Sequence, residues 1–380
     1  MPAGSAAPAV VPAVADALAG RVGVLPVPAD DERGSRSLTT ALRAGDEVDD
    51  DVALVVSTSG TTGIPKGAML TAAALTASAQ ATHDRLGGPG QWLLALSAVH
   101  VAGFQVLVRS VVADTTPVAL SPSFVAAELV SAIDSMTSDR RYASLVAVQL
   151  DRALQDSSAA AALAQLDRVL IGGGPMPTAL AQKAAAAGIP VVRTYGMSET
   201  AGGCVYDGVP LDGVRVRIDH GRIVVGGRTL AKGYRNPVEP DPFADAGWFR
   251  TDDVGVLDDS GRLSVVGRVD DAISTGGLTV MPQLVEAALA THPSVAESAV
   301  FGVADARLGQ RVVATIVLSP GCDAPTLTEL RSHVATALDA TAAPREIHVV
   351  EELLRRGIGK VDRRALAARY GGQAGDRGGA

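Results

Sequence analysis

Residues 57–67 combine hydroxyl groups, glycines and a lysine in one short segment, a combination suited to binding phosphate. The segment is Ser57-Thr58-Ser59-Gly60-Thr61-Thr62-Gly63-Ile64-Pro65-Lys66-Gly67. Glycines permit positive φ angles and let backbone N–H groups converge on an anion, and hydroxyl and ammonium groups add further donors. A plain surface turn rarely needs so many hydroxyls beside a lysine. The segment therefore predicts a phosphate-binding loop.

The flanking residues predict how this loop is held. The apolar run 52–56 suits a buried strand, and an alanine-rich helix is expected after residues 68–71. Strand, loop and helix in this order form an arrangement that cradles phosphate. The loop is not a Walker A motif, which requires Gly-x-x-x-x-Gly-Lys followed by Ser or Thr, because Lys66 stands between Pro65 and Gly67. A P-loop NTPase is thereby excluded.

Two further motifs follow apolar runs that suit strands. The triplet Gly172-Gly173-Gly174 would let backbone lie flat against a ligand ring, although a plain turn is the alternative. The segment Tyr195-Gly196-Met197-Ser198-Glu199-Thr200 places an aromatic face, a hydroxyl and a carboxylate within a few residues. One carboxylate can ligate a phosphate-bound Mg²⁺, and the alternative is a Ser/Glu pair that caps a helix.

Three more polar segments lie in the second half of the chain. Residues 247–255 contain the adjacent carboxylates Asp252 and Asp253. Residues 267–273 contain Arg268 and Asp270 and are followed by a glycine pair. Residues 357–363 read Gly357-Ile358-Gly359-Lys360-Val361-Asp362-Arg363. Most lysines are simply exposed surface residues. Lys360 is not interpreted in this way, because five motifs precede it in a consistent order along the chain.

In content, order and spacing these motifs resemble those of the adenylate-forming superfamily: acyl-CoA synthetases, peptide-synthetase adenylation domains and luciferases. The resemblance covers roughly residues 50–370. It implies a reaction in two steps. A carboxylate first attacks the α-phosphate of Mg·ATP to give an acyl-adenylate and pyrophosphate, and the thiolate of CoA then displaces AMP. ATP, Mg²⁺ and CoA are therefore the expected cofactors and co-substrates.

The resemblance also implies a role for each matching residue. Glu199 would hold Mg²⁺, Ser198 would meet the α-phosphate, and Lys360 would bridge carboxylate and α-phosphate oxygens during adenylation. Asp270 occupies the hinge position of a rotating lid. The glycine pair that lines the pantetheine tunnel is Gly276-Gly277. The ATP-binding residues would be Ser57, Thr58, Ser59, Gly60, Thr61, Thr62, Gly63, Lys66, Gly172, Gly173, Gly174, Tyr195, Gly196, Asp253 and Arg268.

The two adjacent aspartates leave one assignment open. Asp253 takes the place of the ribose-binding aspartate, and Asp252 stands where the family usually has glycine. The residue pattern alone does not decide which carboxylate faces the ribose. An idle aspartate in a polar β-turn is the interpretation favoured for Asp252.

The acid substrate is predicted from residues 92–111. His100 and Gly103 lie where the family leads the chain to its acyl pocket, and Arg109 interrupts an otherwise apolar helix. Arg109 is either on an exposed helix face or at a site for a second carboxylate. This segment, the 357–363 loop and the 56 residues before the phosphate loop resemble short actinobacterial o-succinylbenzoate–CoA ligases of menaquinone biosynthesis. Ligases for another acid or a carrier-protein thiol, and a non-catalytic nucleotide-binding relative, are the alternatives.

Composition excludes several classes of protein. The chain has 380 residues, of which 47% are hydrophobic, and a formal net charge of −8. This charge disfavours general binding to nucleic acid or anionic membranes. Cys204 and Cys322 are too few for a disulfide scaffold, and neither a secretory signal nor a membrane-spanning apolar run is evident. We therefore expect a cytoplasmic protein, and a homodimer is compatible with the sequence.

The order of apolar and polar runs predicts an α/β fold with two domains. Between residues 52 and 200 short strand-like runs alternate with alanine-rich helical ones, and from about residue 210 short strands between Gly/Asp turns suggest a β-rich subdomain. We expect a large N-terminal domain of layered α/β subdomains over residues 1–267. A small mobile α+β lid domain is expected over 268–370, followed by a disordered tail over 371–380.

Overall fold

The computed structural model of the chain describes residues 1, 4–58, 65–356 and 360–371. The chain divides into two compact units. Unit 1 comprises Met1–Arg217, Val224–Thr251 and Leu257–Leu263, and unit 2 comprises Ile218–Ile223, Asp252–Val256 and Ser264–Ala380. The domain boundary expected after residue 267 stays a prediction, and the tail from residue 372 lies outside the described residues.

Unit 1 contains a seven-stranded sheet of order β4-β3-β5-β6-β7-β8-β9. Neighbours from β4 to β7 are parallel, and β8 and β9 are antiparallel to their neighbours. All residues of β3 are buried, as expected for a parallel strand covered on both faces. The strands are β3 (Gln91–Leu94), β4 (Val118–Ala119), β5 (Arg141–Val146), β6 (Arg168–Gly172), β7 (Val191–Met197), β8 (Gly202–Tyr206) and β9 (Val209–Pro210).

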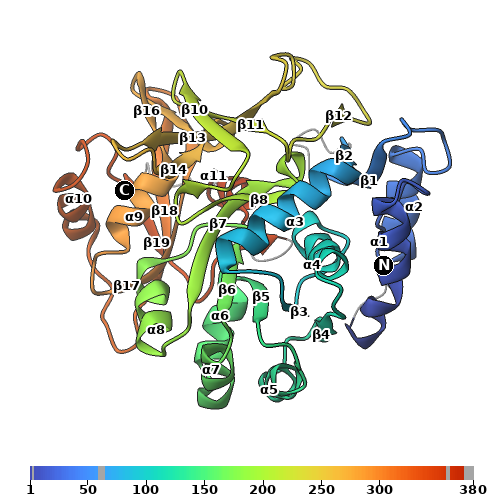
Figure 1. Cartoon of the computed structure of the whole chain (residues 1–380). Coiled ribbons are helices and arrows are strands. Elements are labelled where there is room, and N and C mark those ends of the chain that lie inside the picture. The colour runs from blue at the N-terminus through green and yellow to red at the C-terminus, as the bar shows by residue number, and fades with distance from the viewer. Residues whose placement is uncertain (2–3, 59–64, 357–359, 372–380) are drawn as a thin grey trace. The chain divides into compact units, whose positions relative to one another are not determined.

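Helices cover both faces of this sheet (Figure 1). Leu93 and Ala143 pack against the helices of one face, which are α5 (Ala126–Asp134), α6 (Ala147–Leu154), α7 (Ser157–Ala164) and α8 (Thr178–Ala186). Because side chains alternate along a strand, Trp92 and Tyr142 point to the other face. There lie α1 (Val11–Leu18), α3 (Ala72–Leu86) and α4 (Val101–Val112). Two further helical elements near the N-terminus are η1 (Gly4–Val10) and α2 (Glu32–Ala41). The predicted α/β class is confirmed.

A three-stranded sheet of order β1-β2-β12 holds the two ends of the phosphate loop. It consists of β1 (Val52–Val56), β2 (Ala68–Thr71) and β12 (Gly233–Tyr234). The helix expected after residues 68–71 is confirmed as α3 (Ala72–Leu86), but residues 68–71 form a strand that was not predicted, so the loop connects two antiparallel strands before the helix begins. Residues 68–71 pair with β1 on one side and β12 on the other, and α3 begins only after Thr71, whose Oγ1 accepts a hydrogen bond from Ala74 N.

The β-rich segment is present as expected. Its four-stranded sheet has the order β10-β11-β13-β14, and residues of this sheet belong to both units. The strands are β10 (Val214–Asp219), β11 (Arg222–Gly227), β13 (Trp248–Leu257) and β14 (Leu263–Arg268). Among the described residues, no helix has the length and apolar character needed to cross a membrane.

The C-terminal part of unit 2 is an α+β fold, as predicted. Its sheet has the order β16-β15-β18-β17, with β19 paired to β18 in parallel. The helices are α9 (Pro282–Leu289), α10 (Leu327–Ala335) and α11 (Arg363–Gly371). The strands are β15 (Ile273–Thr275), β16 (Leu278–Val280), β17 (Val295–Asp305), β18 (Gly309–Leu318), β19 (Glu346–Val349), β20 (Arg355–Arg356) and β21 (Lys360–Val361), and η3 spans Val269–Asp271.

Two apolar layers enclose this sheet. On one face α9 and α10 pack on Val300 and Ile316, and on the other face α11 packs on Phe301 and Val313. Each layer uses alternate residues of β17 and β18, as the period of two along a strand requires. The sheet therefore gives α9 and α11 fixed positions on opposite faces.

Candidate active site

The structure links Lys66 to Glu199 through Tyr234, all within unit 1. Tyr234 donates a hydrogen bond from its hydroxyl to Glu199 Oε1 at 2.6 Å. Lys66 Nζ lies 5.1 Å from the centroid of the Tyr234 ring, within cation–π range. Tyr234 lies opposite Ala68 in the sheet that holds the phosphate loop. The cation at one end of the loop and the carboxylate of the 195–200 motif are thus brought to the same tyrosine.

Glu199 is well suited to hold a cation together with phosphate oxygens. It lies on the single turn η2 (Ser198–Thr200) and is 8% exposed. Its backbone oxygen accepts a hydrogen bond from Ala231 N at 2.9 Å, which fixes the turn. Among the described residues no group of three His, Cys, Asp or Glu side chains could hold a metal ion. A Mg²⁺ here would therefore be coordinated by phosphate oxygens of the nucleotide and by water in addition to one carboxylate, which is the common coordination of Mg²⁺ in proteins.

Only part of the phosphate loop is described. Ser57, Thr58 and Lys66 are half-buried, and the expected contact residues Ser59, Gly60, Thr61, Thr62 and Gly63 lie outside the described residues. Thr58 Oγ1 is buried without a hydrogen-bond partner in the described part of the chain. A buried hydroxyl of this kind is costly unless a ligand or water satisfies it. Gly67 has φ +71°, and a Cβ there would approach Leu42 Cδ2 to 2.6 Å.

The glycine triplet and the tyrosine motif lie on neighbouring parallel strands. Thr194 Oγ1, next to Tyr195, donates to Ile171 O at 3.2 Å, next to Gly172. A Cβ on Gly172 would come within 2.4 Å of Thr194 Oγ1, so glycine is needed for this approach. Gly173 and Gly174 are exposed, and Tyr195, Gly196 and Ser198 are half-buried. Parallel strands end at one edge, so these motifs share the edge where open α/β sheets bind ligands.

Arg109 is buried, so its placement on an exposed helix face is wrong. It lies in the last turn of α4 and is 3% exposed. Its guanidinium carbon is 4.6 Å from the centre of the Trp92 ring, and Nη1 and Nη2 donate long hydrogen bonds of 3.4 Å to Ser144 Oγ and Tyr206 Oη. Its Nε has no hydrogen-bond partner among the residues that the structure describes. Burial lowers the pKa of the Arg109 guanidinium from its ordinary value.

The other two acyl-site candidates occupy the start of α4. His100 is exposed and directly precedes the helix. Gly103 is buried, and a Cβ there would lie 2.3 Å from Ser97 O. The close return of the chain after β3 therefore accounts for glycine at this position.

Gln105 and Tyr234 were not identified from the sequence. Gln105 is fully buried, its Nε2 donates to Ala201 O at 2.8 Å, and its Oε1 has no partner in the described part of the chain. It lies one helical turn before Arg109, so both unmatched polar atoms are on one face of α4. In the sequence, Gln105 stands out only as a glutamine inside an apolar run, and Tyr234 has no feature that marks it as a site residue beyond its aromatic ring.

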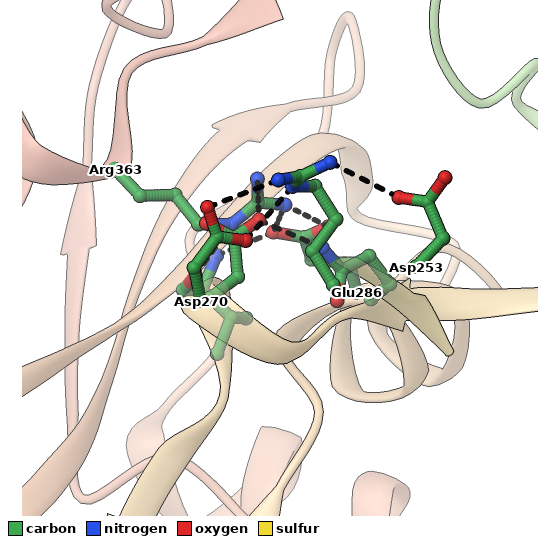
Figure 2. Close-up of polar contacts among 8 residues, drawn as sticks. Asp253, Asp270, Glu286 and Arg363 are labelled. Carbon is green, nitrogen blue, oxygen red and sulfur yellow. Dashed lines mark hydrogen bonds and ion pairs between the residues drawn. The ribbon is translucent and has the colours of Figure 1, made fainter. Parts of the chain in front are cut away.

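In unit 2 the strand β13 separates the roles of the two adjacent aspartates. Burial alternates along β13, so Asp253 is buried whereas Asp252 is exposed. Arg268 Nη1 donates to Asp253 Oδ1 at 3.2 Å (Figure 2). Asp252 pairs with Arg222 and lies 3.5 Å from Arg268, so it is neither idle nor in a turn. Of the two carboxylates, Asp253 lies on the buried face of the strand.

Asp270 forms a two-point ion pair with Arg268. Arg268 Nε lies 2.8 Å from Asp270 Oδ1, and Nη2 lies 3.1 Å from Oδ2 (Figure 2). Burial by itself would raise the pKa of Asp270, but the hydrogen bonds and charge of Arg268 outweigh it and lower the pKa below its ordinary value. Arg268 therefore joins the expected hinge residue to the expected ribose-binding residue within unit 2.

The remaining predicted residues lie on two hairpins of unit 2. Gly276 and Gly277 form the two-residue turn between β15 and β16, with φ +58° and +84°. A two-residue turn with both φ angles positive favours glycine. Lys360 is exposed on β21, opposite Arg356 of β20. Gly357, Ile358 and Gly359 of the same motif lie outside the described residues.

Comparison with known proteins finds relatives along the whole chain. Family models described as AMP-binding enzyme and AMP-binding enzyme C-terminal domain match residues 15–235 and 284–360. A probable 2-succinylbenzoate–CoA ligase of Mycobacterium tuberculosis (strain ATCC 25618 / H37Rv) is 64% identical over 380 residues, covering 98% of each chain. The 2-succinylbenzoate–CoA ligase of Bacillus licheniformis is 34% identical over 350 residues, covering 83% of this chain and 70% of the relative.

Solved structures show the same relationship. The o-succinylbenzoate CoA synthetase of Bacillus subtilis, in complex with its acyl-adenylate intermediate OSB-AMP, matches with a TM-score of 0.70 and 29% identity. The match covers 83% of this chain and 69% of that one. ATP-bound MatB from Rhodopseudomonas palustris matches with a TM-score of 0.76 and 28% identity, covering 90% of this chain and 73% of that one.

Proposed function

Because the chain belongs to the AMP-binding enzyme family, we propose that it is an ATP-dependent acid–CoA ligase that activates 2-succinylbenzoate in menaquinone biosynthesis. The chain-long identity to a relative of that name supports the substrate. The observation that carries the proposed ATP site is the contact of both Lys66 and Glu199 with one tyrosine, Tyr234. A cation and a cation-binding carboxylate beside a Ser/Thr/Gly loop are what a Mg·ATP site requires.

The first step needs positioned charge rather than covalent chemistry by the protein. Lys66 and the hydroxyls of Ser57 and Thr58 would bind phosphate oxygens, and Glu199 would hold Mg²⁺ against them. Lys360 would bridge the acid's carboxylate and the α-phosphate, where negative charge must be brought together for attack. Preorganised donors of this kind usually account for much of an enzyme's rate enhancement.

The nucleotide and the second step involve other residues. Gly172–Gly174 and the Tyr195 ring would bind adenine, Ser198 the α-phosphate, and Asp253 the ribose, with Arg268 at ribose or phosphate. Rotation about Asp270 would then withdraw Lys360 and bring Gly276 and Gly277 to the pantetheine arm. Domain-scale gating of this kind is a known means of separating two half-reactions.

The second carboxylate of 2-succinylbenzoate needs its own partner. Only the succinyl carboxylate is activated, so the benzoate carboxylate must be bound away from ATP. Arg109 is proposed to bind it, with His100 and Gly103 at the entrance of the acyl pocket. The unmatched atoms Arg109 Nε and Gln105 Oε1 on one face of α4 support a polar ligand or water there.

The test is ATP–pyrophosphate exchange with 2-succinylbenzoate, benzoate and medium-chain fatty acids, followed by thioester formation with CoA or a carrier-protein thiol. We expect exchange with 2-succinylbenzoate and transfer to CoA. A preference for a monocarboxylate would overturn the substrate, and transfer only to a carrier protein would overturn the acceptor. No exchange with any acid would favour a non-catalytic nucleotide-binding protein. A cytoplasmic location and a homodimer remain predictions from the sequence.

A further inference from the structure

Arg363 is the centre of a largely buried polar cluster in unit 2. Its Nη2 donates to both carboxylate oxygens of Glu286 at 2.7 and 2.8 Å, and its Nη1 lies 3.3 Å from Asp271 Oδ2 (Figure 2). Its Nε donates to Val300 O at 3.0 Å. The side chains of Arg363 and Glu286 are 18% and 14% exposed. One guanidinium thus fixes groups from α9, β17 and the η3 turn.

The cluster is close in sequence to Lys360. Lys360 and Val361 form β21, Asp362 accepts a hydrogen bond from Ala365 N at 3.0 Å through Oδ1, and α11 starts at Arg363. Asp362 N also donates to Leu354 O at 2.9 Å, which closes the hairpin that carries Lys360. The backbone between Lys360 and Arg363 is therefore short and constrained, so a shift of Arg363 displaces the lysine.

Apolar contacts alone do not fix the orientation of α11. Leu366 and Tyr370 anchor the helix to Phe301 and Val313, but apolar packing is not directional. The hydrogen bonds of Arg363 are directional, because the nitrogens of one planar guanidinium have fixed relative positions and each has its own partner. Nη2 donates to Glu286, Nη1 to Asp271 and Nε to the carbonyl oxygen of Val300. They determine how the first turn of α11, and so the end of the lysine hairpin, lies on the sheet.

The same cluster reaches the expected hinge. Asp271 Oδ2 accepts from Arg363 and also from Gln283 Nε2 at 3.1 Å, and its neighbour Asp270 is paired with Arg268. Arg363 therefore contacts both the segment that carries Lys360 and the segment that follows Asp270.

We propose that Arg363, Glu286 and Asp271 form a clasp that positions Lys360 for adenylation. This inference rests on the proposed role of Lys360 in the first step. The three clasp residues are not assigned any contact with substrate, and they affect the reaction only by positioning Lys360. Weakening the clasp should therefore impair adenylation selectively. Conversion of supplied acyl-adenylate and CoA to thioester, which does not use Lys360, should be preserved.

The test uses the full chain and two conservative variants. Arg363→Lys keeps the positive charge but has one nitrogen in place of three, so it cannot reach Glu286, Asp271 and Val300 O together. Glu286→Gln keeps the shape and loses the charge. Both should lower the adenylation rate by about tenfold or more, since misplacement by roughly 1 Å can cost on the order of 10²-fold. The rate of thioester formation should change by no more than about twofold, because this step does not use Lys360.

A matched control uses another Arg–Glu pair of unit 2. Arg311 Nε lies 3.1 Å from Glu346 Oε2, in strands that do not carry Lys360. Glu346→Gln makes the same chemical change, so it can lower the unfolding temperature but should not separate the two half-reactions. Asp271→Asn, at the more exposed rim of the clasp, should show a smaller separation if Arg363→Lys or Glu286→Gln does not fold.

Each result has a defined reading. Folded clasp variants that slow both half-reactions equally, or neither, would overturn the clasp. Lys360→Ala is measured in parallel: if it too slows both half-reactions equally, the assigned role of the lysine fails rather than the clasp. As a direct readout, amide hydrogen exchange over residues 360–366 should quicken in Arg363→Lys and remain unchanged in Glu346→Gln.

Discussion

His83 is expected to make the stability of unit 1 dependent on pH. It lies in the last turn of α3, is 4% exposed, and its Nε2 accepts a hydrogen bond from Trp92 Nε1 at 3.4 Å. Burial, assisted by the charge of Arg109 and partly opposed by Asp84, lowers the pKa of His83 from 6.5 to about 4. The native state therefore holds this imidazole neutral where an unfolded chain would protonate it.

The sign and size of the effect follow from that pKa difference. Above pH 6.5 the imidazole is neutral in both states and costs nothing. As the pH falls from 6.5 toward 4, the unfolded state binds a proton that the native state does not, so the free energy of unfolding decreases. A pKa difference of ~2.5 corresponds to about 3 kcal/mol, which is fully lost below pH ~4.

The assay compares the wild type with His83→Gln, whose side-chain oxygen can still accept from Trp92. Both tryptophans, Trp92 and Trp248, lie in unit 1, so their fluorescence during urea unfolding reports on that unit. The difference in unfolding free energy between the two proteins should change by about 3 kcal/mol between pH 7 and pH 4, in favour of the variant at low pH. Carboxylates that titrate in this range cancel in the difference. A difference that does not change with pH would refute the reasoning.

Three further predictions concern the reaction. Lys360→Ala should raise the activation barrier of adenylation by on the order of 3 kcal/mol, yet still convert supplied acyl-adenylate to thioester. An equal loss of adenylation and thioester formation would contradict the role of Lys360. Asp270→Pro fixes φ near −65° and should accumulate adenylate without thioester, whereas Asp270→Ala, which removes only the ion pair with Arg268, should still turn over; a normal thioester yield from the proline variant would remove the hinge assignment. Arg109→Leu should raise KM for 2-succinylbenzoate and leave the apparent affinities for ATP and CoA nearly unchanged. Wild-type kinetics toward the acid would make Arg109 a structural residue.

The strands and helices of the core could be predicted because their apolar runs are long enough to show a period. The apolar run 145–148 would suit a strand throughout, but β5 ends at Val146. Gln149 Oε1 accepts a hydrogen bond from Val146 N at 3.1 Å, and this local contact starts α6 at Ala147. The residue pattern from Ser123 onward suits a helix, but α5 begins only at Ala126, because Phe124 has a φ of +49°, which a helix cannot include. Local polar contacts and single backbone angles set these ends, and neither is visible in a hydrophobic pattern.

The site was predictable motif by motif but not as an arrangement. Residues within one motif are neighbours in sequence, so Asp252 and Asp253 could be named, and the alternation of β13 then separated them. Tyr234 and Glu199 are 35 residues apart, and their contact depends on β12 pairing with β2. Short strands such as β12 carry too little pattern to be recognised, so the residue that links two motifs was missed.

A comparison of three arginines supports the assignment of Arg109. Arg268 lies beside three carboxylates, those of Asp252, Asp253 and Asp270, and Arg363 lies beside two. Arg109 is the most buried of the three, yet no carboxylate from the described residues lies within ion-pair distance of it.

The contacts that Arg109 does have compensate its charge only in part. The aromatic face of Trp92 and the carboxyl end of α4 each stabilise a cation by on the order of 1–2 kcal/mol. The cost of burying an unpaired charge is several kcal/mol. A substrate carboxylate at Nε would supply the missing charge and would be bound the more tightly because the guanidinium is already desolvated. Replacing Arg109 by leucine should then leave the unfolding temperature unchanged or raised while binding of the acid weakens, and a loss of both would indicate that the arginine only supports the fold.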